Sequence, residues 1–142
     1  MEYRYTDPAT GQTVSRKTYF PMPGAQIPVR EESGEVHLLQ WGCRTGEEGE
    51  GLDLPVTGWA RLLSLSEGKW NRYRPRRVKI PARRWMEKDS ARTSHWFELD
   101  EAEALLGVRI DRPEKSVVYV VTKPSVNTPF AGVHPRVPLI VR

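Results

Sequence analysis

The chain has 142 residues, the usual size of one domain, and its 38% of hydrophobic residues is enough for one modest core. It carries a formal net charge of +4 and a single cysteine, Cys43, which excludes an intramolecular disulfide and a cysteine-based zinc site. Without an apolar run of roughly 20 residues or a hydrophobic signal core at the N-terminus, the sequence predicts a cytoplasmic protein with no membrane contact. Three scattered histidines make a poor metal site, so we expect no metal and no cofactor.

Residues 1–18 are polar and carry turn signals at Asp7-Pro8 and Thr10-Gly11. We therefore expect a mobile or loosely packed N-terminal arm, followed by one domain over residues 19–142. Within that domain a Gly- and Glu-rich loop over Gly42–Gly58 is either a flap or disordered.

Short apolar or alternating runs predict strands along the domain. The run Val117–Thr122 is continuously apolar except at its end, so it should be a central strand buried on both faces. The other predicted strands are Ala25–Val29, Glu35–Trp41, Trp59–Leu65, Val78–Ile80, Arg84–Lys88, His95–Leu99 and Val137–Val141.

One helix is predicted over Asp100–Gly107, from an aspartate at the N-cap position, a glutamate three residues later and a C-terminal glycine. Many strands with one short helix indicate an α+β fold that is mainly antiparallel β, in a single compact domain.

The charge is unevenly distributed along the chain. Between Glu31 and Asp53 there are seven carboxylates and one arginine, whereas Lys69–Arg84 holds eight cations and no carboxylate. Aromatic residues are interleaved with these cations, and one acid, Glu87, follows them. This pattern favours a nucleic-acid groove with one reactive group, although a basic surface that has no partner is the alternative.

In the groove hypothesis, arginines bind phosphates and tryptophan rings stack on bases. The candidate phosphate contacts are Arg72, Arg74, Arg76 and Arg77, and the candidate stacking residues are Trp41, Trp70 and Trp85.

Glu87 and His134 are the candidates for acid–base chemistry. The alternatives are an ordinary ion pair of Glu87 with Arg84 or Arg61, and a turn in which the His134 imidazole satisfies a carbonyl group. Cys43 is more typical of a buried apolar residue than of a nucleophile.

Five short strings occur in a fixed order along the chain. Two lie early: Tyr19–Val29 is similar to Tyr-Asn-x-x-Pro-Thr-x-x-x-Pro-Val, and Leu39–Gly42 to Arg-Trp-Gly-Leu. Three follow: Trp59–Arg61 is similar to Asn-Ala-Arg, Arg76–Glu87 to Arg-Arg-Cys-Leu-Val-Pro-Ala-x-Gly-Phe-Tyr-Glu, and Tyr119–Thr122 with His134–Pro138 to a strand ending in Thr followed by His-x-Arg-Met-Pro. In this order they resemble the SOS response-associated peptidase-like (SRAP) family.

The resemblance implies a β-rich domain with a basic cleft that binds single-stranded or junction DNA in the response to DNA damage. The family crosslinks an N-terminal cysteine to the opened sugar of an abasic site, assisted by a glutamate and a histidine. By resemblance these two are Glu87 and His134, and the residues at or near the DNA are Trp41, Arg61, Thr122 and Arg136.

The sequence also departs from the family pattern. Residue 2 is Glu2 instead of the cysteine, Phe20 and Trp59 replace two asparagines, and Leu63 replaces a carboxylate. These departures indicate a divergent, trimmed relative of the kind that phages and prophages carry.

We therefore expect a protein that binds single-stranded or abasic DNA without the cysteine crosslink. One alternative is residual abasic-site enzyme activity, of Schiff-base, lyase or peptidase-like type, with the Met1 α-amine as nucleophile. Another is a protein-interaction module that contacts a basic partner through the acidic segment Glu47–Asp53.

Overall fold

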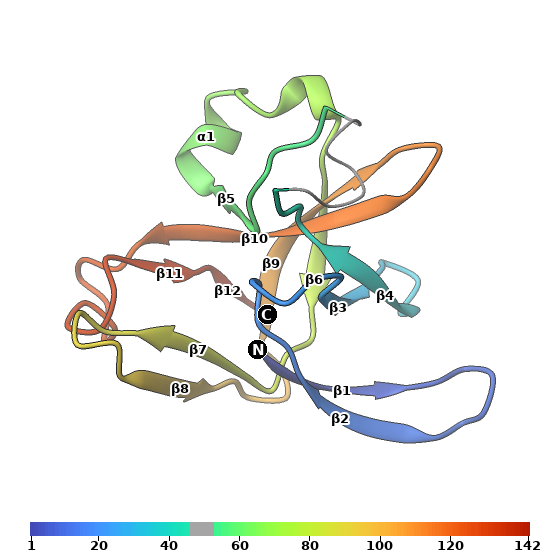
Figure 1. The fold of residues 1–142 in the computed structure, drawn as a ribbon, viewed down its shortest axis with the longest axis horizontal. Helices are drawn as coiled ribbons and strands as arrows, with labels where there is room; N and C mark the ends of the chain where they lie inside the picture. Colours follow the sequence, from blue (N-terminus) through green and yellow to red (C-terminus); the bar gives the residue numbers. More distant parts are fainter. Residues whose placement is uncertain (46–52) are drawn as a thin grey trace.

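The strand β10 (Ser116–Pro124) is the centre of the fold in a computed structural model, which describes residues 1–45 and 53–142 (Figure 1). One edge of β10 pairs in parallel with β4 (Val36–Trp41) and β5 (Trp59–Arg61), and the other pairs antiparallel with β9 (Ala104–Asp111) and β11 (Arg136–Pro138). Val118 and Val120 lie in one core cluster and Val117, Tyr119 and Val121 in another. The predicted burial of this strand on both faces is confirmed.

The strands around β10 join edge to edge into a closed ring. From β4 the pairing runs through β3 (Gln26–Arg30) to β6 (Arg76–Ile80), then to β9 and back to β10, with β12 (Ile140–Val141) added to β9. Closure leaves few open sheet edges, and it brings the end of β10 next to both β5 and β11.

A four-stranded sheet lies beside this ring, in the order β2 (Thr13–Lys17), β1 (Glu2–Thr6), β7 (Arg84–Lys88) and β8 (Ser94–Glu98). Residues 1–18 are therefore a hairpin instead of the expected loose arm. Met1 is 5% exposed and Tyr3 is 2% exposed, and the Tyr3 hydroxyl donates to the Gln26 carbonyl at 3.0 Å. Alternation in β1 places Tyr3 in the core between half-buried Glu2 and exposed Arg4, so the overall polarity of the segment hid the strand.

The short helix of the fold, α1 (Leu62–Ser66), overlaps the segment predicted as the strand Trp59–Leu65, of which only the first three residues are extended. The helix lies over β5 and β10 (Figure 1). Leu62 and Leu65, with Tyr73 of the 3₁₀ turn η2 (Asn71–Tyr73), pack against the second core cluster, which contains Tyr119.

The prediction of a helix over Asp100–Gly107 is wrong, because the strand β9 begins at Ala104. The local capping contact does form, since the Asp100 N–H donates to Glu103 Oε1 at 2.9 Å. The chain then extends because β9 pairs with β6, β10 and β12 and buries Ala104–Val108, which outweighs a few tenths of a kcal/mol of local helix preference per residue.

The architecture is thus mainly β, with antiparallel and some parallel pairings and one short helix among the described residues. The strands predicted between Ala25 and Leu99, other than Trp59–Leu65, are confirmed to within two residues, and Val137–Val141 is split between β11 and β12. Residues 46–52 of the predicted Gly42–Gly58 loop lie outside the described residues. No described helix is long and apolar enough to span a membrane.

Candidate functional site

Glu87 and His134, far apart in the chain, meet in space. Glu87 lies on β7, and His134 lies in the connection between β10 and β11. His134 Nδ1 is 3.8 Å from Glu87 Oε2, and the Glu87 side chain is 19% exposed. Arg84, an expected alternative partner of Glu87, instead forms an ion pair with Glu2.

The backbone of Arg136 fixes the His134 ring. Nδ1 lies 3.1 Å from the Arg136 nitrogen and 2.9 Å from the Arg136 carbonyl oxygen, so this one residue satisfies Nδ1 in either neutral tautomer. The His134 ring therefore lies next to a backbone carbonyl, as the alternative interpretation expected, and it also lies next to Glu87. The Ser125 hydroxyl donates to the His134 carbonyl and holds this connection from the other side.

The α-amine of Met1 belongs to the same site. It donates to the Thr18 carbonyl at 2.7 Å, and burial lowers its pKa from 8.0 to about 6, partly opposed by the charges of Glu2 and Glu87. Burial also raises the pKa of the Glu87 carboxyl, against the effects of His134 and of the amine. A largely neutral amine near neutral pH is a nucleophile, and a carboxyl with a raised pKa can exchange protons with it.

Two adjoining cavities, of about 410 and 380 Å³, share Trp59, Glu87 and His134 as lining residues. We call them together the Glu87 trough. The first is also lined by Met1, Tyr19, Phe20, Pro21, Trp41, Met86 and Lys88, and the second by Thr57, Arg61, Thr122 and Arg136.

Aromatic rings form one wall of the trough. Phe20 packs against Trp41 and Trp59 with ring centroids 5.8 and 4.8 Å apart, and Trp59 is 39% exposed. The Trp41 indole donates to the Gly58 carbonyl at 3.0 Å, and a Cβ on Gly58 would lie 2.5 Å from the Phe20 ring. Trp41 is thereby fixed and buried, while Trp59, which lines both cavities, stays partly exposed.

Two arginines flank the second cavity. Arg136 is held by Thr122, whose hydroxyl and carbonyl oxygens each accept from its guanidinium at 3.1 Å. Burial lowers the pKa of Arg136, and the charge of nearby Arg61 adds to this effect. Because two cations lie close together here, an anionic group placed between them would relieve their repulsion.

Several predicted binding residues do not line the trough. Trp85 is 2% exposed and packs against Phe97 and Phe130, which leaves no ring face for a base. Trp70 packs against Tyr119 in the second core cluster. Arg72 pairs with Asp53, Arg76 pairs with Glu31 and Asp111, and neither of the exposed residues Arg74 and Arg77 lines a trough cavity.

Trp59, like Phe20 and Lys88, is a residue of the trough that the sequence interpretation missed as a ligand contact. It appears in the sequence only as a departure from a family asparagine. The available signal was the exposed end of a short strand, where Trp59 stands two residues before Arg61.

The site brings together the Glu87 carboxyl, the His134 imidazole, the Met1 amine, the guanidinium groups of Arg61 and Arg136 and an aromatic wall. Within residues 1–45 and 53–142, no group of three or more His, Cys, Asp or Glu side chains is arranged to hold a metal ion. No protein-family model and no curated protein matches the sequence, so the SRAP resemblance remains a prediction based on its strings of residues.

Proposed function

We propose that the protein binds single-stranded DNA in the Glu87 trough, as the resemblance to the SRAP family implies. The observation that carries the proposal is the meeting of Glu87 and His134 at 3.8 Å beside an exposed tryptophan and two arginines. Arg61 and Arg136 would bind backbone phosphates, and a base would stack on Trp59.

The proposal is tested by fluorescence anisotropy with a labelled single-stranded oligonucleotide. If Arg61, Arg136 and Lys88 neutralise three phosphates, log Kd should rise with log salt concentration with a slope of about 2. Trp59→Ala should weaken binding by about fivefold to 150-fold, because one stacked base contributes about 1–3 kcal/mol.

Arg77→Gln is the matched control, because Arg77 is an exposed arginine outside the trough. Its affinity should stay close to that of the parent protein. Binding in the trough would be refuted if the affinity for the oligonucleotide did not change with salt concentration. It would also be refuted if only Arg72→Gln and Arg77→Gln lowered that affinity.

A second function, capture of abasic DNA, is favoured by the Met1 α-amine in the same cavity as Glu87 and His134. The neutral amine would attack the aldehyde carbon of the opened sugar, and loss of one water would leave a C=N bond. Glu87 would take the proton from the amine and supply one to the departing oxygen, while His134 would polarise the sugar oxygen.

Borohydride reduces such a C=N bond to a stable amine and so traps the complex. On a chain whose first residue is verified as Met1 by mass spectrometry, we expect a trapped band with abasic DNA. Glu87→Gln should lower its yield at least tenfold, and acetylation of the amine should abolish it. A band that survives acetylation would exclude Met1 as the nucleophile.

A further inference from the structure

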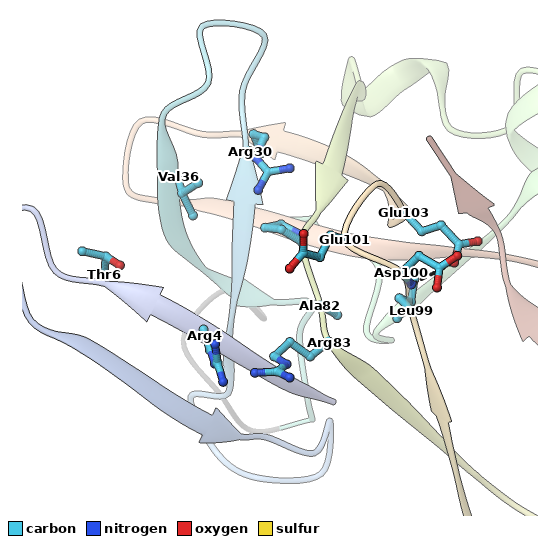
Figure 2. A pocket seen from close by; sticks show the side chains of 11 residues that line it. Arg4, Thr6, Arg30, Val36, Ala82, Arg83, Leu99, Asp100, Glu101 and Glu103 are labelled. Carbon is cyan, nitrogen blue, oxygen red and sulfur yellow. Dashed lines mark hydrogen bonds between the residues drawn. The ribbon is translucent and has the colours of Figure 1, made fainter.

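A second cleft, of about 450 Å³, lies between β1, the ends of β3 and β6 and the turn that joins β8 to β9 (Figure 2). It shares no lining residue with the Glu87 trough. Six charged side chains line it: Arg4, Arg30, Arg83, Asp100, Glu101 and Glu103.

The cations come from three separate segments: Arg4 from β1, Arg30 from the end of β3 and Arg83 from the connection between β6 and β7. All three are exposed, and in the described part of the chain none is in an ion pair. Other arginines of the same sheets behave differently, since Arg84 and Arg109 each contact a carboxylate.

The acids lie together in the turn before β9. The Glu103 carboxylate is held there by the N–H of Asp100 at 2.9 Å, and Figure 2 shows both side chains on the side of the cleft away from Arg4 and Arg83. No ion pair joins these acids to the arginines among residues 1–45 and 53–142. Figure 2 shows the Glu101 side chain apart from these two acids, toward Arg30 and Arg83. The cleft therefore presents three guanidinium groups together with the Glu101 carboxylate.

We propose that this cleft binds a small bipolar molecule, with a phosphate group on the arginines and an ammonium group on the Glu101 carboxylate. Guanidinium groups match the oxygens of a phosphate, and carboxylates attract an ammonium group. A ligand of this kind would relieve the repulsion among the three arginines and place its ammonium group beside Glu101.

Two observations distinguish this ligand from a nucleic-acid strand. The three carboxylates would repel a chain of phosphates passing through the cleft, and no aromatic side chain lines it to stack on a base. The inference is independent of the proposed function, because the two sites have no residue in common.

Phosphoethanolamine is a probe with both charges, and inorganic phosphate and ethanolamine represent its halves. We would titrate each into the ¹⁵N-labelled protein at low salt and follow the amide signals of Arg4, Arg83 and Glu101. Saturable shifts are expected, with phosphoethanolamine binding at least tenfold tighter than either half.

Two substitutions of exposed residues separate the phosphate contacts from the ammonium contact. Arg83→Gln should weaken phosphoethanolamine and inorganic phosphate by about tenfold each, whereas Glu101→Gln should weaken only phosphoethanolamine. The control is Arg92→Gln, an exposed arginine outside the cleft, which should leave both affinities unchanged.

The inference is overturned if no probe gives saturable shifts at these amides. It is also overturned if phosphoethanolamine binds no tighter than phosphate and Glu101→Gln has no effect, or if a single-stranded oligonucleotide displaces phosphoethanolamine from the cleft.

Discussion

At the scale of single residues, Met1 and Glu87 illustrate how burial prepares a pair of groups for proton exchange. Burial disfavours the charged form of each, so it lowers the pKa of the amine and raises the pKa of the carboxyl. Attraction between the two charges opposes both shifts but does not cancel them. The result is an amine that loses its proton more readily than an ordinary α-amine does.

This amine makes the stability of the fold depend on pH. Its pKa is about 6 when folded and 8.0 ordinarily, so between these values the unfolded chain binds more protons and the free energy of unfolding rises with pH. This difference of about two units between the folded and the ordinary pKa corresponds to at most about 2–3 kcal/mol in the free energy of unfolding. The raised pKa of Glu87 contributes stability at low pH that is lost as the pH rises from 4.5 through its folded pKa.

Chemical denaturation at pH 5.5 and pH 8.5 measures the effect of the amine. The N-acetylated chain is the control, since it keeps every histidine and carboxyl group but cannot titrate at Met1. We expect the free energy of unfolding to rise between pH 5.5 and pH 8.5 in the unmodified chain, and to rise much less in the acetylated chain. An equal gain in both chains would show that the Met1 amine is not the group responsible.

At the scale of elements, close backbone contacts position β4 against β5 and so shape the aromatic wall. Gly42, which follows β4, has φ +57° and donates its N–H to the Val118 carbonyl at 2.8 Å. A Cβ at this position would lie 2.1 Å from the Thr57 carbonyl oxygen. No side chain fits there without movement of the backbone next to Gly58 and Trp59.

Gly42→Ala should therefore destabilise the fold by about 2–3 kcal/mol, through overpacking and an unfavourable backbone conformation. Gly132→Ala is the matched control, because a Cβ there would meet nothing within 4 Å. Urea denaturation of both variants checks this, and equal stability of the two would contradict the account of this contact.

The sequence predicts elements well where burial pattern and local preference agree. Val117–Thr122 is apolar and β-branched, and it forms β10 as expected. At Asp100–Gly107 the local signals favour a helix, but pairing with three strands decides the outcome. The hairpin of β1 and β2 was missed because its buried residues are few and its outer strand is wholly exposed.

At the scale of the whole molecule, the fold places the cations of the basic stretch Lys69–Arg84 in different environments. Arg72, Arg76 and Arg84 form ion pairs, and Arg83 lines the second cleft. Glu31 and Asp53, from the acidic part of the chain, supply two of the partners. The distribution of charge along the sequence therefore led to the prediction of a nucleic-acid partner, but it did not show which cations line the candidate site.

The site itself depends on contacts that no local pattern contains. The pairing of Glu87 with His134 was reached from the family resemblance, and the structure places the two side chains 3.8 Å apart. Arg61 and Arg136 join them because β5 and β11 both pair with the end of β10. Sequence periodicity does not reveal such a meeting of distant strands.

Photo-crosslinking tests the central claim, that a DNA strand lies in the Glu87 trough, most directly. A single-stranded oligonucleotide carrying 5-iodouracil would be irradiated with the protein, and the attached peptide identified by mass spectrometry. We predict attachment to Trp59 or Phe20, which line the trough. Attachment only to Trp70 or Tyr73, in the basic stretch outside it, would contradict the claim.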